Sequence, residues 1–191
     1  MNESIVDELV AQSKSGNAEA FGRLIEHFTP LVTRMVVAQG VRRDDRGDVI
    51  QEVFMRAFTS LNSFDSEKRF EPWLAGVAFR TIKNHWRNAG RRKDITESEL
   101  SDNFLQGIRG SGEWNGPEET AVRNETEQAL LRSLDALSES QKHAVVCFYF
   151  EDMTVSEIAD ATGWSPSKVK VILYRARLKL RRVLKEQYEG R

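Results

Sequence analysis

Apolar residues recur every three or four positions through the N-terminal half of the chain, which is the period of one buried helix face. The pattern predicts a short amphipathic helix over residues 4–14. A second helix follows, and Asn17 has the side chain to cap its first amides. We expect Pro30 to break or kink this second helix before residues 31–38, because proline has no amide hydrogen to continue the ladder.

Two more helices are predicted in this half. Asp44 or Asp45 opens the first of them, which runs to Leu61. A polar connector, residues 62–71, leads to the next helix, which begins at Pro72, since proline fits the first helical turn. The chain has only four prolines and shows no long alternation of β-branched residues, so we predict an all-α fold.

The helical pattern stops after residue 93. Residues 94–123 are polar, acidic and glycine-rich, and they repeat with neither helix nor strand period, which indicates a flexible linker. A loop of about 30 residues is unusual inside one compact domain. We therefore predict two small helical domains, residues 1–93 and residues 124–191, joined by this long linker.

A helix-turn-helix signature lies near the C-terminus. Thr154 and Glu157 have the spacing of a capping box, and Gly163 can take the left-handed conformation that ends a helix. Ser165 and Pro166 then suit the cap and the first position of a new helix. In such an arrangement the second helix enters a DNA major groove.

Basic residues gather on two of the predicted helices, although the net charge of the chain is only −1. On the last helix eight cations occur with no acid among them: Lys168, Lys170, Arg175, Arg177, Lys179, Arg181, Arg182 and Lys185. On the fourth helix Arg80, Lys83, Arg87 and Arg91 fall on one stripe. Clustered cations of this kind favour binding to a polyanion such as nucleic acid, because binding releases the counterions of the polyanion. A solvated basic face is the alternative that charge alone leaves open.

The remaining chemistry of the sequence points away from an enzyme. Cys147 is the single cysteine, which excludes an internal disulfide and a cysteine-cluster zinc site. His27, His85 and His143 share no metal-ligand spacing, and no nucleophile is paired with a base. We expect no catalytic residue, no metal, no cofactor and no small-molecule substrate. With no signal peptide or spanning segment visible, we expect a cytoplasmic protein.

Four strings, in order, carry a family resemblance: AFGRLIEHFTPLV, DVIQEVFMRAF, FEPWLAGVAFRTIKNHWR and LSESQKHAVVCFYFEDMTVSEIADATGWSPSKVKVILYRARLKLRRVL. The chain resembles the bacterial RNA polymerase sigma factors of the extracytoplasmic-function (ECF) type, group IV of the sigma-70 family. The strings cover nearly all of the chain outside the linker. The resemblance implies that residues 1–93 are sigma region 2, which binds core polymerase and the −10 promoter element. Residues 124–191 would be region 4, which binds the −35 element.

The resemblance also implies roles for single residues. The residues that match the −35 readers are Lys168, Lys170, Val171, Tyr174 and Arg175. Those that match the −10 readers are Phe64, Phe70, Arg80, Lys83, Asn84 and Arg87. The match to the polymerase-binding segment comprises Asp48, Gln51, Glu52 and Arg56. Arg80 and Asn84 stand where such factors often have asparagine and aspartate, which leaves the preferred −10 bases open.

The partners that the resemblance implies are core RNA polymerase, promoter DNA and an anti-sigma factor. Polymerase contact would use the clamp of the largest subunit and the flap of the second-largest subunit. The anti-sigma factor, often embedded in the membrane, would hold the protein off DNA and bring it to the membrane. A stand-alone helix-turn-helix regulator is the rival hypothesis. It predicts a dimer on palindromic sites and leaves residues 44–93 without a role.

Overall fold

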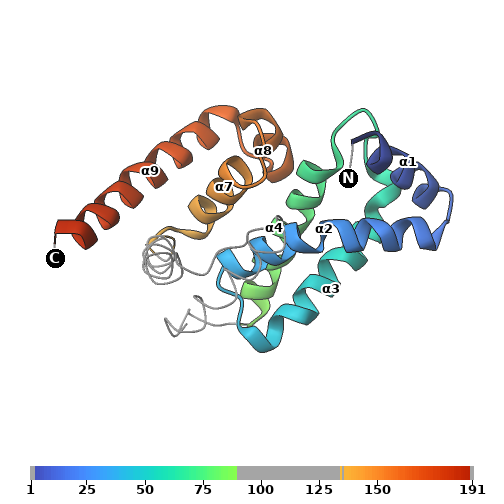
Figure 1. The fold of residues 1–191 in the computed structure, drawn as a ribbon, viewed down its shortest axis with the longest axis horizontal. Coiled ribbons are helices and arrows are strands. Elements are labelled where there is room, and N and C mark those ends of the chain that lie inside the picture. Colours follow the sequence, from blue (N-terminus) through green and yellow to red (C-terminus); the bar gives the residue numbers. More distant parts are fainter. Residues whose placement is uncertain (1–2, 90–133, 135, 190–191) are drawn as a thin grey trace, which may run out of the picture.

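The computed structural model describes residues 3–89, 134 and 136–189, and every regular element within these residues is a helix (Figure 1). The first half contains α1 (Glu3–Lys14), α2 (Ala18–Ala38), α3 (Arg43–Ser60), the 3-10 turn η1 (Leu61–Ser63) and α4 (Phe70–Ala89). The second half contains α7 (Glu139–Tyr149), α8 (Val155–Thr162) and α9 (Pro166–Glu189). The predicted all-α class is confirmed. The predicted linker, residues 94–123, lies outside the described residues.

Local side chains set several helix starts, including the predicted cap at Asn17. The side chain of Asn17 accepts hydrogen bonds from the amides of Glu19 and Ala20 at the start of α2. Ser138 and Gln141 form a capping box at the start of α7. In each case a side-chain oxygen satisfies amides that the first helical turn leaves without an acceptor.

Pro30 does not break α2. The helix is continuous from residue 18 to residue 38, although an internal proline removes one hydrogen bond and costs about 3 kcal/mol or more. Phe28 and Leu31, on either side of Pro30, are both buried in the core. Packing of this long apolar face therefore keeps the helix intact across the proline.

Two other helix starts differ from the expectation. α3 begins at Arg43, so Asp44 and Asp45 lie in its first turn and do not cap it. Their carboxylates still meet the positive end of the helix dipole. α4 begins at Phe70, which places Pro72 in the first turn, where a missing amide hydrogen has no consequence.

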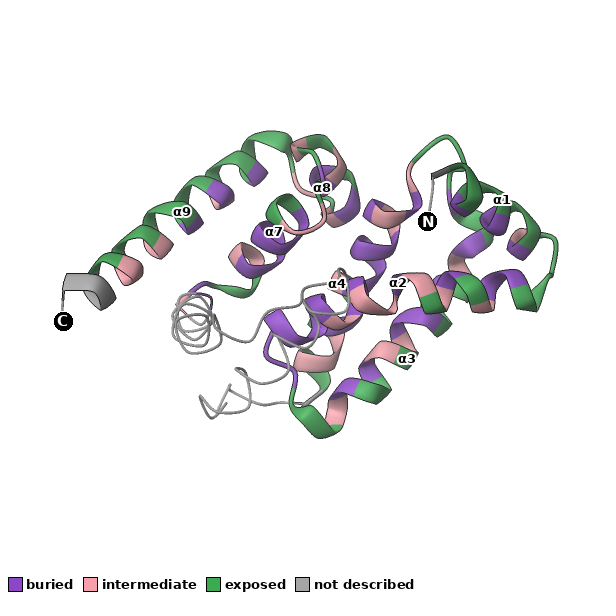
Figure 2. Cartoon of the chain, in the orientation of Figure 1, coloured by how far each residue is buried: buried purple, intermediate pink, exposed green. Residues whose placement is uncertain are grey.

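The two halves pack together into one body. Within the first half α1 packs on α2, α2 on α3, and α3 on α4; within the second, α7 and α8 pack on α9. Between the halves α4 packs along α8, and α2 packs against α7 (Figure 1). Figure 2 shows the buried sides of these helices turned toward one another. None of the described helices combines the length and apolar character needed to cross a membrane.

Candidate nucleic-acid interface

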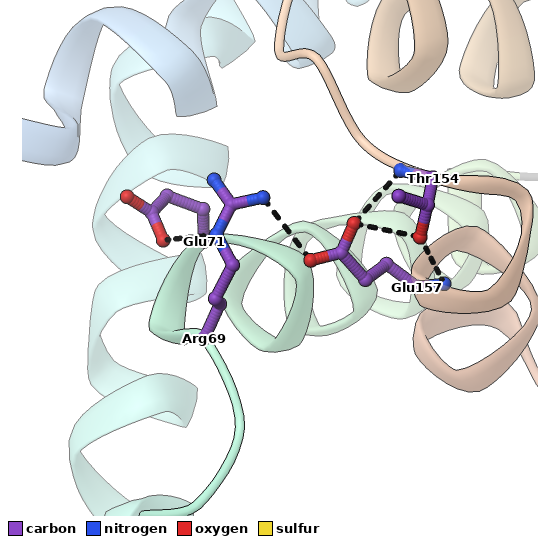
Figure 3. Close-up of polar contacts among 4 residues, drawn as sticks. All are labelled: Arg69, Glu71, Thr154 and Glu157. Atoms are coloured by element: carbon purple, nitrogen blue, oxygen red, sulfur yellow. Dashed lines mark hydrogen bonds and ion pairs between the residues drawn. The ribbon is translucent and has the colours of Figure 1, made fainter. Parts of the chain in front are cut away.

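The predicted helix-turn-helix is present, and its first helix is capped as expected. The hydroxyl of Thr154 accepts the amide of Glu157 at 3.2 Å, and the carboxylate of Glu157 accepts the amide of Thr154 at 2.7 Å (Figure 3). α8 ends at Gly163, which adopts the left-handed conformation at φ 73°. A side chain at that φ would be strained, so glycine fixes the direction of the turn.

α9 has a buried side and an exposed side. The hydroxyl of Ser165 accepts the amide of Lys168 at 3.2 Å and so caps the helix. The buried side of α9 consists of Val169, Leu173 and Ala176. The five predicted −35 residues all lie on the exposed side: Lys168, Lys170, Val171, Tyr174 and Arg175. Figure 2 shows this exposed side running along the length of α9.

The exposed side of α9 also carries apolar groups. Val171 is 46% exposed and Tyr174 is 58% exposed, and Leu178, one turn further on, is 51% exposed. Leu178 was not among the predicted DNA-binding residues, although its spacing from Tyr174 points to it. Apolar side chains among cations are typical of a surface that contacts DNA bases. The apolar groups can contact a thymine methyl group while the cations bind the DNA phosphates.

The second predicted DNA surface lies on α4. Arg80, Lys83 and Arg87 are exposed and Asn84 is partly buried. The guanidinium of Arg80 is engaged across the molecule, where Nη1 donates to the carbonyl oxygen of Ala161 at 3.0 Å. The structure therefore brings one predicted −10 residue against the end of α8.

Phe64 and Phe70 belong to an aromatic cluster of the core. Phe64 is 5% exposed and Phe70 is 2% exposed. Their ring centroids lie 5.5 Å apart, and each lies within 5.3 Å of the ring of Trp73. In this conformation both rings serve packing, so their contact with an extruded base stays a prediction.

The structure adds two cations that were not among the predicted DNA-binding residues. Lys68 and Arg69 lie in the connector before α4. Lys68 Nζ is 2.9 Å from Asp160 Oδ2. Arg69 Nη1 is 3.1 Å from Glu157 Oε1, as Figure 3 shows. Both acids belong to α8. No sequence signal links these pairs, because the partners are about 90 residues apart along the chain.

A cavity of about 500 Å³ lies between this connector and α8. Its walls combine apolar and charged groups: Phe64, Pro72 and Trp73 on one side, with Arg69, Arg80, Glu157 and Asp160 around them. The cavity therefore opens beside the predicted −10 surface.

The charges across this cavity alter one another's ionisation. Partial burial alone would raise the pKa of Glu157, but hydrogen bonds from Thr154 and the charge of Arg69 outweigh it and lower that pKa. The hydrogen bond and charge of Asp160 raise the pKa of Lys68. Each shift favours the charged form, so Glu157 and Lys68 are ionised at neutral pH.

The predicted polymerase-binding residues lie on the outer side of α3. Asp48, Gln51 and Arg56 are exposed and Glu52 is partly buried. Arg56 Nε and Nη2 donate to Glu52 Oε1 at 2.9 and 2.6 Å. This intrahelical pair orients both charges along the surface of the helix.

An apolar groove of about 590 Å³ runs between α2 and α3 beside Gln51. Its lining includes Phe21, Phe54, Met55 and Phe58. Met55 is 61% exposed and Phe58 is 50% exposed. Helical spacing alone would place Phe58 on the buried side of α3, but half of the residue is exposed, and its ring makes an edge-on contact with the ring of Phe21 on α2, at 4.9 Å between ring centroids. Met55 could have been found as an apolar residue on an otherwise polar face.

The buried thiol and imidazole of α7 are not reactive groups. Burial, with the nearby charge of Glu151, raises the pKa of the Cys147 thiol far above its ordinary value. Burial lowers the pKa of His143 to about 3. Among the described residues, no three histidine, cysteine, aspartate or glutamate side chains gather as a metal site.

Comparisons with known proteins match both halves of the chain. Residues 24–92 match the family Sigma-70 region 2, and residues 127–180 match the family Sigma-70, region 4. Together the two matches cover more than half of the chain.

Two curated relatives match most of the chain. The ECF RNA polymerase sigma factor BldN of Streptomyces coelicolor is 27% identical over 179 residues, which are 93% of this chain and 65% of BldN. The chain thus spans just under two thirds of that relative. The ECF RNA polymerase sigma-E factor of Escherichia coli is 28% identical over 180 residues, 93% of either chain.

Two solved structures share the fold. The structure of CnrH in complex with the cytosolic domain of CnrY matches with a TM-score of 0.68 at 23% identity, covering 95% of this chain and 97% of that chain. The sigma factor RpoE in complex with the anti-sigma factor NepR, from Bartonella quintana, matches with a TM-score of 0.64 at 16% identity, covering 88% and 98%.

Proposed function

The chain belongs to the sigma-70 family of RNA polymerase sigma factors, in the ECF type, and we propose on that premise that it directs core RNA polymerase to promoters. One observation carries the proposal. The two matched regions fall, in order, on two helical halves, and each half has a helix with an exposed row of cations. A stand-alone regulator needs only one such helix.

In this proposal α9 reads duplex DNA at the −35 element. The helix enters the major groove, with Lys170 and Arg175 as the main polar contacts. A bidentate arginine contact to guanine is worth about 1–3 kcal/mol of discrimination. Val171 and Tyr174 are exposed on the same side and supply apolar contacts to the bases.

α4 and its connector bind the opened −10 element. Unstacking a base costs a few kcal/mol, and stacking it on an aromatic ring returns about 1–3 kcal/mol. Contacts to the backbone must supply the rest, and the exposed cations Lys83 and Arg87 are placed to make them. Arg80 and Asn84 complete this surface.

α3 binds the polymerase. Asp48, Gln51 and Glu52 offer polar contacts to the clamp of the largest subunit. Met55 and Phe58 extend that surface into the neighbouring apolar groove, which supports a protein partner because exposed apolar patches of this kind mark docking sites. The α9 half would bind the flap of the second-largest subunit.

An anti-sigma factor is the proposed regulator. RpoE is bound to the anti-sigma factor NepR in its solved structure, and we extend that kind of partner to this chain. The chain would act in the cytoplasm, held at the membrane where its anti-sigma factor is membrane-bound. RNA synthesis belongs to the polymerase, so the chain itself supplies no catalytic residue and no cofactor.

Transcription in vitro tests this function. Core polymerase is incubated with and without the chain on a pool of promoter fragments, and the transcripts are sequenced. We expect new start sites with shared −10 and −35 elements only when the chain is present. Start sites that do not change on any template would overturn the proposal.

Gel filtration and a core-polymerase pull-down separate this proposal from the stand-alone regulator. We expect a monomer that core polymerase captures. A dimer that core polymerase ignores would favour the regulator.

A further inference from the structure

Lys14 is the last residue of α1, and its side chain reaches across to the connector before α4. Its Nζ donates to the carbonyl oxygen of Phe64 at 2.6 Å and to Oγ of Ser66 at 2.8 Å. The same ammonium lies 5.4 Å from the centroid of the Phe64 ring, within the range of a cation–π contact. A lysine in the last turn of a helix is ordinarily explained by the helix dipole, but this one binds two residues of a distant segment.

α1 is a firm support for this contact. Val6, Leu9 and Val10 are each only 2% exposed, and α1 packs on α2. Lys14 is itself partly buried. A hydrogen bond from an ammonium group is stronger than one between neutral groups, and partial burial weakens it less than full solvent would. The contact can therefore hold a segment that lacks a regular hydrogen-bond ladder of its own.

The segment that it holds is one turn of the connector, residues 64–68, which we call the connector turn. Phe64 begins it, with a side chain buried in the aromatic cluster of the core. Asp65 closes it: its carboxylate accepts the amide of Glu67 at 3.1 Å, and its carbonyl oxygen accepts the amide of Lys68 at 3.0 Å. The turn thus has a fixed base, while the side chains that follow Phe64 are exposed.

Ser66 lies at the exposed tip of the connector turn. Lysine has donors only, so Ser66 Oγ acts as the acceptor in its contact with Lys14. The hydroxyl hydrogen of Ser66 is then left to donate elsewhere, in a direction that the ammonium restricts. An exposed donor with a restricted direction suits an extruded base, because such a base is recognised by hydrogen bonds to its edge.

We propose that Lys14 is a positioning residue for −10 recognition, which holds the connector turn in place with the Ser66 hydroxyl directed outward. The inference rests on the proposed function and adds α1 to it. A turn that is ordered beforehand accepts a base without the entropic cost of ordering on binding. A wrong base leaves the fixed donor unpaired, which gives the turn its discrimination.

Two substitutions at Lys14 separate the ammonium from the rest of the side chain. Lys14→Met keeps an unbranched side chain and removes the charge and the donors. Lys14→Arg keeps both and should restore the contact. Arg23→Met is the matched control, because Arg23 is an exposed cation on α2 and its loss changes the net charge by the same amount.

Transcription with core polymerase measures the base preference. The template is the strongest promoter that the wild-type chain selects, with every position of its −10 and −35 elements randomised, and transcript sequencing gives the preference at each position. Lys14→Met should lower the preference by about tenfold at one position of the −10 element. Preferences in the −35 element and capture by core polymerase should not change. Lys14→Arg should recover most of the lost preference, and Arg23→Met should match the wild type.

Hydrogen–deuterium exchange of the free chain measures the order of the connector turn. In Lys14→Met the amides of Glu67 and Lys68 should exchange about tenfold faster than in the wild type, because the turn opens locally more often. The amides of α3 should not change. This measurement needs neither polymerase nor DNA, so unchanged exchange would refute the positioning role even if the wild-type chain directs transcription. A wild-type chain that leaves transcription unchanged would instead refute the proposed function.

Three other outcomes in Lys14→Met would also overturn the inference. Equal weakening for all −10 sequences would show that Lys14 itself contacts a phosphate. Loss of polymerase capture together with −10 preference would show that Lys14 only stabilises the fold. The same loss in Arg23→Met would assign the effect to net charge.

If Lys14→Met does not fold, as judged by circular dichroism, Ser66→Ala decides. That change removes an exposed hydroxyl and one of the two acceptors for the ammonium. It should lower the base preference at a single −10 position and speed exchange in the connector turn. Wild-type preference and exchange in Ser66→Ala would contradict the proposal.

Discussion

His143 is enclosed at the boundary between α7 and α4. Its ring centroid lies 4.3 Å from that of Phe79, and its Nε2 lies 3.6 Å from Sγ of Cys147. Its Nδ1 is buried and has no hydrogen-bond partner among the described residues. Burial accordingly lowers its pKa from 6.5 to about 3, and the folded chain holds the ring neutral.

This shift makes the stability of the protein depend on pH. Between pH 6.5 and about pH 3 the unfolded chain binds a proton at His143 that the folded chain does not. The stabilisation is complete above pH 6.5 and is lost as the pH falls. From pH 7 to pH 5.5 we expect His143 to account for a loss of about 1 kcal/mol in the free energy of unfolding.

Urea unfolding at the two pH values measures the loss. In His143→Gln the drop between pH 7 and pH 5.5 should shrink by about 1 kcal/mol, whatever the absolute stability of the variant. The other two histidines are common to both chains and cancel in the comparison. Equal drops in the two chains would contradict a buried neutral imidazole.

At the scale of single residues, the sequence predicted what depends on near neighbours. Asn17 caps α2 and Gly163 ends α8 as expected, because both roles follow from chemistry within a few residues. The pairing of Lys68 and Arg69 with α8 was not predictable. Nothing in the local sequence distinguishes those two cations from ordinary surface charges.

At the scale of elements, the capping box of α8 gives a measurable contribution. Thr154→Ala removes the acceptor for the amide of Glu157. Loss of such a cap costs about 1 kcal/mol, and we expect that decrease in urea unfolding. Ser156→Ala, at an exposed position in the same turn, is the control and should change stability by less than about 0.5 kcal/mol. Equal effects would show that the cap is not what stabilises the turn.

α9 and α3 should fail in opposite ways. Lys170→Ala and Arg175→Ala remove exposed cations from α9, so we expect each to weaken −35 duplex binding by about tenfold, equivalent to about 1.4 kcal/mol. Capture by core polymerase should be unaffected. Asp48→Arg on α3 should impair capture first and leave duplex binding intact.

Binding of labelled −35 duplex and pull-down with core polymerase separate the two roles of these helices. Loss of both activities in the α9 variants would mean that α9 has a structural role instead. The same result for Asp48→Arg would remove α3 from the polymerase surface.

Tertiary packing, and not the local sequence alone, decides where some helices end and which of their residues are buried. The sequence predicted a break or kink at Pro30; the break is absent, because buried residues on both sides of the proline hold α2 together. Helical spacing would also place Phe58 in the core, yet half of the residue is exposed. Spacing identifies a helix face, but only the neighbouring helices decide how much of that face is covered.

At the scale of the whole molecule, the ion pair of Arg34 and Glu151 joins the two halves. Their side chains are only 11% and 9% exposed. Removing one partner of a largely buried pair leaves a poorly compensated charge, which costs about 3 kcal/mol or more. Glu151→Gln should therefore lower the stability of the closed arrangement and increase the radius of gyration.

Urea unfolding and small-angle scattering test this effect against a matched change. Glu52→Gln breaks the pair with Arg56, whose side chains are 47% and 45% exposed, and should cost about 0.5 kcal/mol or less. Similar losses in the two variants would show that the pair between the halves has no special weight.

The sequence predicted two helical units, and the described residues contain both. It could not predict that they pack against each other. The contact joins α4 to α8 and α2 to α7. The two helices of each pair belong to different halves of the chain and are far apart in the sequence. The hydrophobic periodicity and the charge pattern describe each helix by itself. They do not indicate which exposed face of one helix packs against another helix.

Trp164 lies in the turn after α8, and its ring centroid is 5.4 Å from that of Phe79 on α4. Separation of the halves would move this indole from aromatic contact into water, which shifts its emission to longer wavelength. With the other three tryptophans replaced by phenylalanine, the protein would report its own opening without an attached dye. Rapid mixing with core polymerase could then time that opening against the first encounter.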